Sequence, residues 1–319
     1  MAKIKKRDAT LIISKKNLPN LFIPGAGKSG TSTLHELLHA HPDICMSSLK
    51  EPHFWTWPHF DTFSDQEFED YTRLFDDEER TYFGESSTGY MCFPNFIERI
   101  QQYYTATPKF IFILRNPIDR AYSHYWWLKG IGSEDLSFRD AFLHDFDVEP
   151  SEDHRLPEAH FKHYYQFGLY AKWLVRFYDA FGAKNIHVIT TEQLKNNRLA
   201  ALNSCFSFLE LKTISAIPEV QSNQTQLLRF PKLYKYAKKL TWGDYKIKRM
   251  AKPFVPKFIR HTLNTKMYNT VYKLTSTNKK YPAISQGDRQ WLKAFYEKDV
   301  VALKELTHQD LSVWTDFSS

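Results

Sequence analysis

The sequence lacks the features of several protein classes. It holds only three cysteines, Cys45, Cys92 and Cys205, which are far apart, odd in number and without metal-ligand spacing. This argues against a disulfide framework and a structural zinc site, and it favours a reducing compartment. The apolar run of the basic N-terminus, residues 11–13, is too short for a signal peptide or a membrane span. We therefore expect a soluble, cytoplasmic protein, either free in solution or peripheral to a membrane.

Acidic residues are almost missing from one segment. Between Arg229 and Lys280 there are fifteen Lys and Arg residues and one acidic residue, Asp244. Such a block favours an anionic polymer or an acidic membrane surface as a partner of residues 229–280, and a solvated helical face explains it equally well. Because no base-stacking module accompanies the charge, we expect no specific nucleic-acid partner.

The order of the predicted elements indicates an α/β protein. With 319 residues and 42% hydrophobic content, the chain can bury a substantial core. Strands that alternate with helices favour a central parallel β-sheet flanked by helices. Apolar runs predict strands at 21–24, 109–114 and 185–190, and helical periodicity predicts helices at 29–40, 61–80, 137–146, 165–181 and after Pro117.

The loop after the first predicted strand is rich in glycine and hydroxyl groups. Gly25, Gly27 and Gly30 allow the backbone to turn tightly and to point successive N–H groups at one anion. Lys28 adds a cation at the same point. Hydroxyl donors follow at the start of a helix, where the dipole favours negative charge; they are Ser29, Thr31, Ser32 and Thr33. The loop therefore predicts an anion-binding site.

This loop does not match that of P-loop kinases and NTPases. Their Walker motif requires glycine where this chain has Phe22. An NTPase also needs an acidic magnesium ligand at the end of a buried strand, but Arg115 follows the strand 109–114 and suits a phosphate. A nucleotide kinase or NTPase is thus the less favoured alternative, together with a non-catalytic protein that binds polyanions or membranes.

Three motifs carry a resemblance to a known family. They are IPGAGKSGTSTL at 23–34, EPHFW at 51–55 and FILRNPIDRAYSHY at 112–125. Together they resemble the sulfotransferases that use 3′-phosphoadenosine 5′-phosphosulfate (PAPS), and are closest in style to the carbohydrate and heparan-sulfate-type members. The resemblance implies a P-loop-like sulfotransferase fold, PAPS as donor, adenosine 3′,5′-bisphosphate as product and no metal.

The resemblance also implies residues for the two ends of the nucleotide. Arg115 and Ser123 would bind the 3′-phosphate, and an arginine is well suited to bidentate phosphate contact. A structural arginine paired with Asp119 is the alternative for Arg115. Lys279 and Lys280 would belong to a basic loop that closes over the phosphates. The 5′-phosphosulfate would lie on Gly27, Lys28, Ser29, Gly30, Thr31, Ser32 and Thr33.

Sulfuryl transfer requires one side chain to stabilise the departing oxygen and another to deprotonate the attacking hydroxyl group. Negative charge grows on the departing phosphate oxygen, and the ammonium of Lys28 would stabilise it. The attacking hydroxyl must lose a proton, and the resemblance points to Glu51 first and His53 second as the base. For these two residues, a surface acid and a packed core histidine are the structural alternatives. Other histidines near the loop, such as His35, are expected to be structural.

The acceptor is less visible in the sequence. The resemblance favours a hydroxyl group of a glycan or glycolipid, and Thr33 supports that branch because small-molecule enzymes often have an adenine-stacking tryptophan there. Ser86 stands where some glycan enzymes have a lysine, so the resemblance does not supply that contact. A stacking platform for a sugar ring and ordinary core packing remain equal interpretations of four tryptophans: Trp55, Trp57, Trp126 and Trp127.

The likeness covers about residues 18–210, with a looser match in 281–314. We therefore predict a single sulfotransferase domain over 1–319, made of a nucleotide-binding core at 18–210 and a helical, basic C-terminal part at 211–319. The polar, proline-bearing stretch 147–160 is predicted to form a mobile loop near the site.

Overall fold

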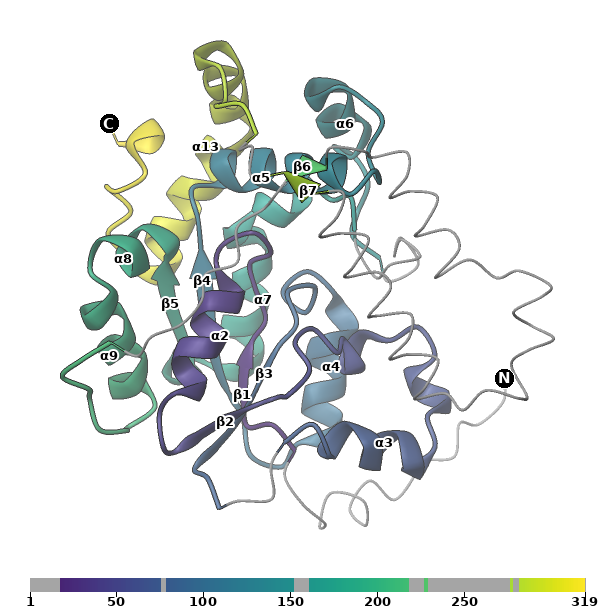
Figure 1. Ribbon diagram of the computed structural model, residues 1–319, viewed down its shortest axis with the longest axis vertical. Coiled ribbons are helices and arrows are strands. Elements are labelled where there is room, and N and C mark those ends of the chain that lie inside the picture. Colours follow the sequence, from purple (N-terminus) through teal and green to yellow (C-terminus); the bar gives the residue numbers. More distant parts are fainter. Residues whose placement is uncertain are drawn as a thin grey trace.

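The fold is built around a parallel five-stranded sheet (Figure 1). The computed structural model describes residues 18–75, 79–151, 161–217, 227–228, 276–277 and 281–318. The strands are β1 (Leu21–Ile23), β2 (Ile44–Met46), β3 (Tyr82–Ser86), β4 (Lys109–Leu114) and β5 (Ile186–Thr190). Their order in the sheet is β2-β3-β1-β4-β5, and all neighbouring pairs are parallel. The predicted α/β fold with a central parallel sheet is confirmed.

The two faces of the sheet carry different side chains, because successive residues of a strand point to opposite faces. Leu21 and Ile23 of β1 join an aliphatic cluster, whereas Phe22 joins a larger aromatic one. The helices on the aliphatic side are α2 (Thr31–His39), α8 (Thr191–Asn196) and α9 (Arg198–Phe208). Those that contribute to the aromatic side are α3 (Asp65–Thr72), α4 (Pro94–Tyr103), α5 (Pro117–Gly130), α6 (Phe138–His144), α7 (Tyr170–Phe181) and α13 (Gln286–Thr307).

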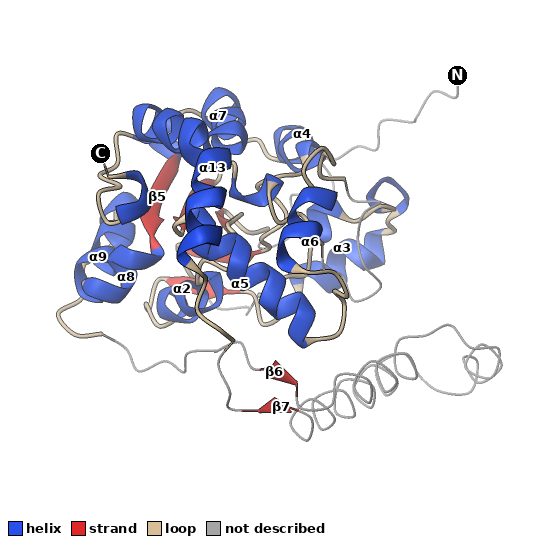
Figure 2. Ribbon diagram, turned by 90° about the horizontal axis from the view of Figure 1, so that it is seen from above, coloured by secondary structure: helices blue, strands red, loops and turns tan. Residues whose placement is uncertain are grey.

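The C-terminal segment returns to this aromatic side. Helix α13 packs against both α5 and α7 (Figure 2). It is followed by a 3₁₀ turn, η6 (Thr315–Phe317), that contacts the same helix. A separate antiparallel pair, β6 (Leu227–Leu228) with β7 (Ser276–Thr277), flanks the basic segment. Most of residues 229–280 lies outside the described residues, so the predicted surface of positive charge stays a prediction.

Two predicted helices are shorter than the sequence pattern indicated. The helix expected at 61–80 is α3 alone, preceded by the 3₁₀ turn η2 (Phe60–Thr62), because Ser64 and Glu67 form a capping box that fixes the helix start. The helix expected at 165–181 begins at Tyr170, and the 3₁₀ turn η4 (Gln166–Gly168) occupies its predicted first residues. The helix after Pro117 begins at that proline, with Asn116 as its N-cap.

Several elements have no clear pattern in the sequence. Strand β2 has only three residues, and β3 contains Gly84, Glu85 and Ser86, which are poor strand formers by propensity. Helix α4 also was not predicted. In the described part of the chain, no helix is both long and apolar enough to cross a membrane.

Candidate functional site

The glycine-rich loop leaves β1 and is clamped to the neighbouring strand β4. The backbone N–H of Ala26 donates to the carbonyl of Ile113 at 2.8 Å, and the N–H of Ile113 donates to the carbonyl of Gly25 at 3.0 Å. Thr191 Oγ1 donates to the carbonyl of Ser29 at 2.5 Å. The loop therefore runs at the carboxyl edge of the sheet, where parallel α/β folds bind their ligands.

The end of the loop forms the start of α2. Gly30, with φ of 93°, is the N-cap of α2, and no side chain in the described residues caps this helix start by a hydrogen bond. A left-handed conformation favours glycine, and the first N–H groups of a helix need acceptors. A Cβ atom on Gly25 would lie 2.9 Å from Met91 Sδ, so the turn also needs glycine for space. This geometry fits the predicted anion site.

Lys28 lies at the centre of the candidate site. Burial lowers the pKa of its ammonium group to about 8; Glu51 opposes the shift, and Arg115 adds to it. The Nζ atom lies 4.7 Å from the ring centroid of Trp127 in α5, a cation–π contact. The ammonium group is thus near a carboxylate, a guanidinium group and an aromatic ring that come from different elements.

Arg115 follows β4 and contacts the glycine-rich loop. Its Nη1 donates to the carbonyl of Lys28 at 3.3 Å, and its own carbonyl accepts from Tyr170 Oη at 2.8 Å. Asp119 pairs with Arg289 of α13 at 2.5 Å. The pairing of Arg115 with Asp119, which was the structural alternative, is therefore not present. Ser123 is buried on the same helix, α5, about one turn after Asp119.

The C-terminal segment braces the residue after Arg115. Asn116 Nδ2 donates to Asp316 Oδ2 at 2.7 Å, and Arg289 Nη1 contacts the same carboxylate oxygen at 2.5 Å. The backbone N–H of Asn116 donates to Glu192 of α8 at 3.3 Å. Segments that are distant in sequence thus hold the turn that carries Arg115 in place.

Glu51 and His53 lie in a turn that follows β2. Both have positive φ, 58° and 52°, which is uncommon for residues other than glycine. The backbone N–H of Glu51 donates to the carbonyl of Ser86 at 2.9 Å, and that of His53 donates to Ser87 Oγ at 3.0 Å. His53 Nε2 lies 3.7 Å from Glu51 Oε2. The turn therefore brings the two candidate bases together.

Glu51 is ionised at neutral pH. Burial alone would raise its pKa, but Lys50 and His53 hold the pKa of this carboxyl group well below its usual range. Lys50 Nζ contacts Glu51 Oε1 at 2.7 Å, and Thr88 Oγ1 donates to the same oxygen at 3.4 Å. The side chain is about one-third exposed. Lys50 and Thr88 were not among the predicted site residues. The sequence offers one signal for Lys50, its position next to Glu51, and none for Thr88.

The four candidate substrate tryptophans have different environments. Trp55 is fully buried, and its indole N–H donates to Tyr71 Oη at 2.9 Å. The prediction that it contacts substrate is wrong, because it packs inside the aromatic cluster. Trp57 is 39% exposed. Trp126 stacks on Tyr281 with ring centroids 6.1 Å apart. Trp127 is the one that contacts Lys28.

The histidines near the loop make contacts within the fold, as expected. His35 Nδ1 lies 2.8 Å from Ser86 Oγ, and burial lowers its pKa to about 4. His41 Nε2 lies 3.0 Å from the carbonyl of Lys212. Lys279 and Lys280 lie outside the described residues, as does most of the predicted loop 147–160, so their proposed roles stay predictions.

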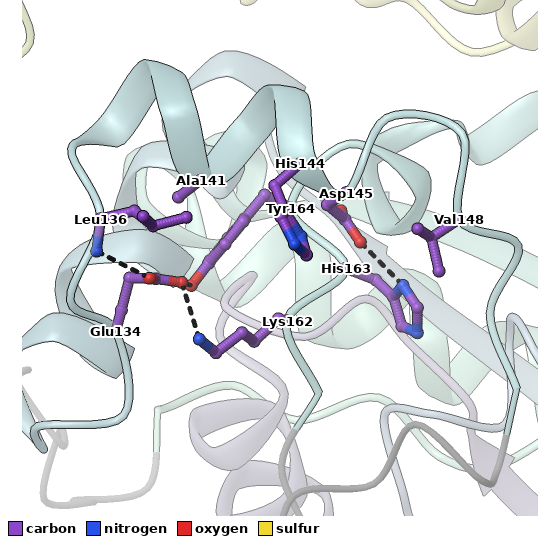
Figure 3. Close-up of a pocket in the computed structure, with 9 residues that line it drawn as sticks. All are labelled: Glu134, Leu136, Ala141, His144, Asp145, Val148, Lys162, His163 and Tyr164. Carbon is purple, nitrogen blue, oxygen red and sulfur yellow. Dashed lines mark hydrogen bonds and ion pairs between the residues drawn. The ribbon is translucent and has the colours of Figure 1, made fainter.

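A cavity of about 290 Å³ lies between α6 and the segment 161–165 (Figure 3). Its polar groups bond to one another. Glu134 accepts from Tyr164 Oη at 2.7 Å and pairs with Lys162 at 3.2 Å. Asp145 pairs with His163 at 2.9 Å. These bonds tie the α6 region to the segment 161–165.

Comparisons with known proteins agree with this geometry. A sulfotransferase from Alicyclobacillus acidocaldarius is similar in structure, with a TM-score of 0.63 and 26% identity, over 94% of this chain and 99% of that one. Carbohydrate sulfotransferase 15 of Rattus norvegicus is 24% identical over 254 residues. That match covers 62% of this chain and 45% of the rat protein, so the chain spans about half the length of this relative.

A second relative and the family model are also sulfotransferases. The membrane-associated sulfotransferase kil1 of Dictyostelium discoideum is 33% identical over 129 residues, which are 38% of this chain and 26% of that protein. The model of the sulfotransferase domain matches residues 18–267, which include the loop after β1, the Glu51–His53 turn and Arg115. The chain therefore belongs to the sulfotransferase domain family.

Proposed function

We propose that this protein transfers a sulfuryl group from PAPS to a carbohydrate hydroxyl group of a glycan or a glycolipid. The observation that carries the proposal is the meeting of Lys28, Arg115 and Glu51 at the carboxyl edge of the sheet. Membership of the sulfotransferase domain family supports the reaction type. The name of the rat relative supports a carbohydrate acceptor.

The donor would bind across two loops. The 5′-phosphosulfate fits the helix start after Gly30, where no side chain caps the first N–H groups of α2 and where Lys28 lies two residues earlier in the loop. Arg115 offers a guanidinium group at the end of the adjacent strand, which suits the 3′-phosphate, with Ser123 as a second donor. The remaining donors of the first loop would be Gly27, Ser29, Thr31, Ser32 and Thr33.

The transfer is an in-line displacement at sulfur. The acceptor oxygen forms a bond to sulfur while the bond from sulfur to the bridging phosphate oxygen breaks, and adenosine 3′,5′-bisphosphate leaves. Lys28, with a pKa of about 8, carries a positive charge at neutral pH and would stabilise the departing oxygen. The proton of the acceptor hydroxyl would pass to Glu51, whose low pKa keeps it ionised.

His53 is the second candidate for the base. It lies 3.7 Å from Glu51 but is only 5% exposed, whereas the Glu51 side chain is about one-third exposed and can meet an acceptor. We therefore assign the proton transfer to Glu51 and an orienting role to His53. Trp57, Trp126 and Trp127 remain candidates for contacts with the sugar, and Trp57 is the most exposed of them.

Calorimetry and a transfer assay test this function. Adenosine 3′,5′-bisphosphate should bind without magnesium and more tightly than ADP or ATP. Labelled PAPS should then transfer its sulfuryl group to a member of a panel of desulfated glycosaminoglycans, glycolipids and phenols. An absence of any preference for the 3′-phosphate would contradict the proposal, and magnesium-dependent turnover of ATP would favour a kinase or NTPase. Transfer to phenols alone would overturn the carbohydrate acceptor.

A further inference from the structure

Glu85 is a carboxyl group inside the aromatic layer of the core. It lies in β3 opposite Phe22 of β1 and is fully buried. Three hydroxyl groups donate to it: Ser87 Oγ at 2.5 Å, Tyr71 Oη at 2.5 Å and Tyr90 Oη at 3.0 Å. Burial raises the pKa of Glu85 to about 7 against these hydrogen bonds. Acidic residues are seldom fully buried unless they have a partner, so this position needs an explanation.

The same hydroxyl groups hold the turn that follows β2. Ser87 Oγ accepts from the backbone N–H of His53 at 3.0 Å. Tyr90 Oη accepts from the backbone N–H of Trp55 at 3.2 Å. Tyr71 Oη accepts from the indole N–H of Trp55 at 2.9 Å. Each hydroxyl group therefore links the buried carboxyl group to the segment that contains the candidate base.

In its ionised form, the carboxyl group of Glu85 sets the direction of these hydroxyl groups. A hydroxyl can donate and accept, whereas an ionised carboxylate only accepts. When Glu85 accepts all three protons, the lone pairs of the same oxygens face the N–H groups of His53 and Trp55. With an apolar side chain at position 85, the hydroxyl protons could rotate away from their present direction. The hydroxyl oxygens would then no longer be held as acceptors for the N–H groups of His53 and Trp55.

The turn needs this support because its backbone is in an uncommon conformation. Glu51 and His53 both have φ in the left-handed region, and such residues persist only where the surrounding structure holds them. The backbone N–H of Glu51 donates to the carbonyl of Ser86, the last residue of the strand that carries Glu85, and that of His53 donates to Oγ of the next residue, Ser87. A change at position 85 would therefore reach the reacting groups through one layer of hydrogen bonds.

We propose that Glu85 is a positioning residue, which acts through its three hydroxyl partners to hold Glu51 and His53 in the orientation that deprotonates the acceptor. This role rests on the proposed function, because it gives the turn its chemical purpose. Glu85 itself is fully buried, and its three hydrogen-bond donors all lie outside the loop after β1.

Three variants separate positioning from stability. In Glu85→Gln and Ser87→Ala, kcat should fall by roughly tenfold to 100-fold, because small displacements of reacting groups have effects of this size. The KM for PAPS and the affinity for adenosine 3′,5′-bisphosphate should stay within about threefold, since the loop after β1 is unchanged. Tyr104→Phe is the matched control: Tyr104 lies in the same cluster, with its ring centroid 5.5 Å from that of Trp55, but it is not one of the three donors to Glu85.

The outcomes distinguish the inference from the proposed function. If folded Glu85→Gln and Ser87→Ala keep their kcat, or if Tyr104→Phe loses as much, the positioning role is wrong. If Glu85→Gln does not fold, Ser87→Ala and Tyr71→Phe decide. If even the wild-type protein transfers nothing from PAPS, the proposed function fails. NMR resonances of the His53 ring then test the inference alone: they should move in Glu85→Gln and Ser87→Ala but not in Tyr104→Phe, and their constancy would overturn it.

Discussion

The loop after β1 and the turn after β2 bring the candidate reacting groups to the same edge of the sheet, but they are built differently. The first is a local structure, in which glycines and a helix start create an anion site from consecutive residues. The second places Glu51 and His53 in left-handed conformations that hydroxyl groups of α3 and of the residues after β3 support. The loop proposed to bind the 5′-phosphosulfate is therefore built mainly from consecutive residues, whereas the turn proposed to activate the acceptor is held by residues distant in sequence.

Glu51→Gln should give the largest difference between the effect on kcat and the effect on nucleotide binding. The amide cannot take up the acceptor proton, so kcat should fall by about 10²- to 10⁴-fold. Binding of adenosine 3′,5′-bisphosphate, measured by calorimetry, should change little, because the loop after β1 is intact. Full activity of Glu51→Gln together with inactivity of His53→Ala would reverse the assignment of the base.

Lys28→Ala should damage both donor binding and chemistry. The loss of a charged donor at the departing oxygen should lower kcat by about 10²- to 10³-fold. Affinity for adenosine 3′,5′-bisphosphate should fall as well, which Glu51→Gln does not produce. Lys172→Ala is the control for removal of one positive charge, since the ammonium group of Lys172 in α7 pairs with Glu149 at 2.6 Å. Equal losses in both variants would contradict a specific role.

Arg115→Ala should change the preference for the nucleotide. A charged hydrogen bond contributes about 1.5–3 kcal/mol, so the affinity for adenosine 3′,5′-bisphosphate should fall by roughly tenfold to 100-fold. The affinity for adenosine 5′-monophosphate should stay nearly unchanged, because it has no 3′-phosphate. Calorimetry with both nucleotides measures this difference. A parallel loss for both would show that Arg115 only supports the loop through its bond to Lys28.

The pH dependence of kcat/KM should report the titration of the Lys28 ammonium group. Its pKa is lowered to about 8 from 10.5 in the folded protein, so the ammonium form is present below pH 8 and is lost as the pH rises through that value. Since kcat/KM reports the free enzyme, its value for PAPS should decline above about pH 8. In Lys28→Arg this decline should disappear, because arginine stays charged. An unchanged alkaline limb in that variant would assign the titration to another group.

The sequence is informative where function depends on consecutive residues. The strand at 109–114, the helix that begins at Pro117 and the loop with Gly25, Gly27 and Gly30 could all be predicted, since their signals are local. β3 could not, because Gly84, Glu85 and Ser86 lack an apolar pattern, and their burial follows from packing between two other strands. The network around Glu85 also depends on Tyr71, which is fourteen positions away.

Two tryptophans show the same limit of prediction from sequence. Trp55 and Trp57 are two positions apart, and the sequence gives no reason to prefer one of them as a contact for a sugar ring. The 3₁₀ turn η1 (Phe54–Thr56) directs Trp55 into the core, where it bonds to Tyr71, and leaves Trp57 39% exposed. Nothing in the local pattern fixes the direction of this turn, since hydrogen bonds from α3, from Tyr90 and from Arg99 of α4 hold it.

Trp57→Ala should have the smallest effect. An exposed side chain contributes little to stability, so the free energy of unfolding should change by less than about 0.5 kcal/mol. If Trp57 stacks on the sugar, the KM for the acceptor should rise by roughly threefold to tenfold with kcat unchanged, as expected for the loss of uniform binding. Trp55→Ala is the contrast, because a large cavity in the core should cost about 3–5 kcal/mol in a denaturant titration. Unchanged acceptor KM in Trp57→Ala would leave Trp126 and Trp127 as the remaining aromatic contacts.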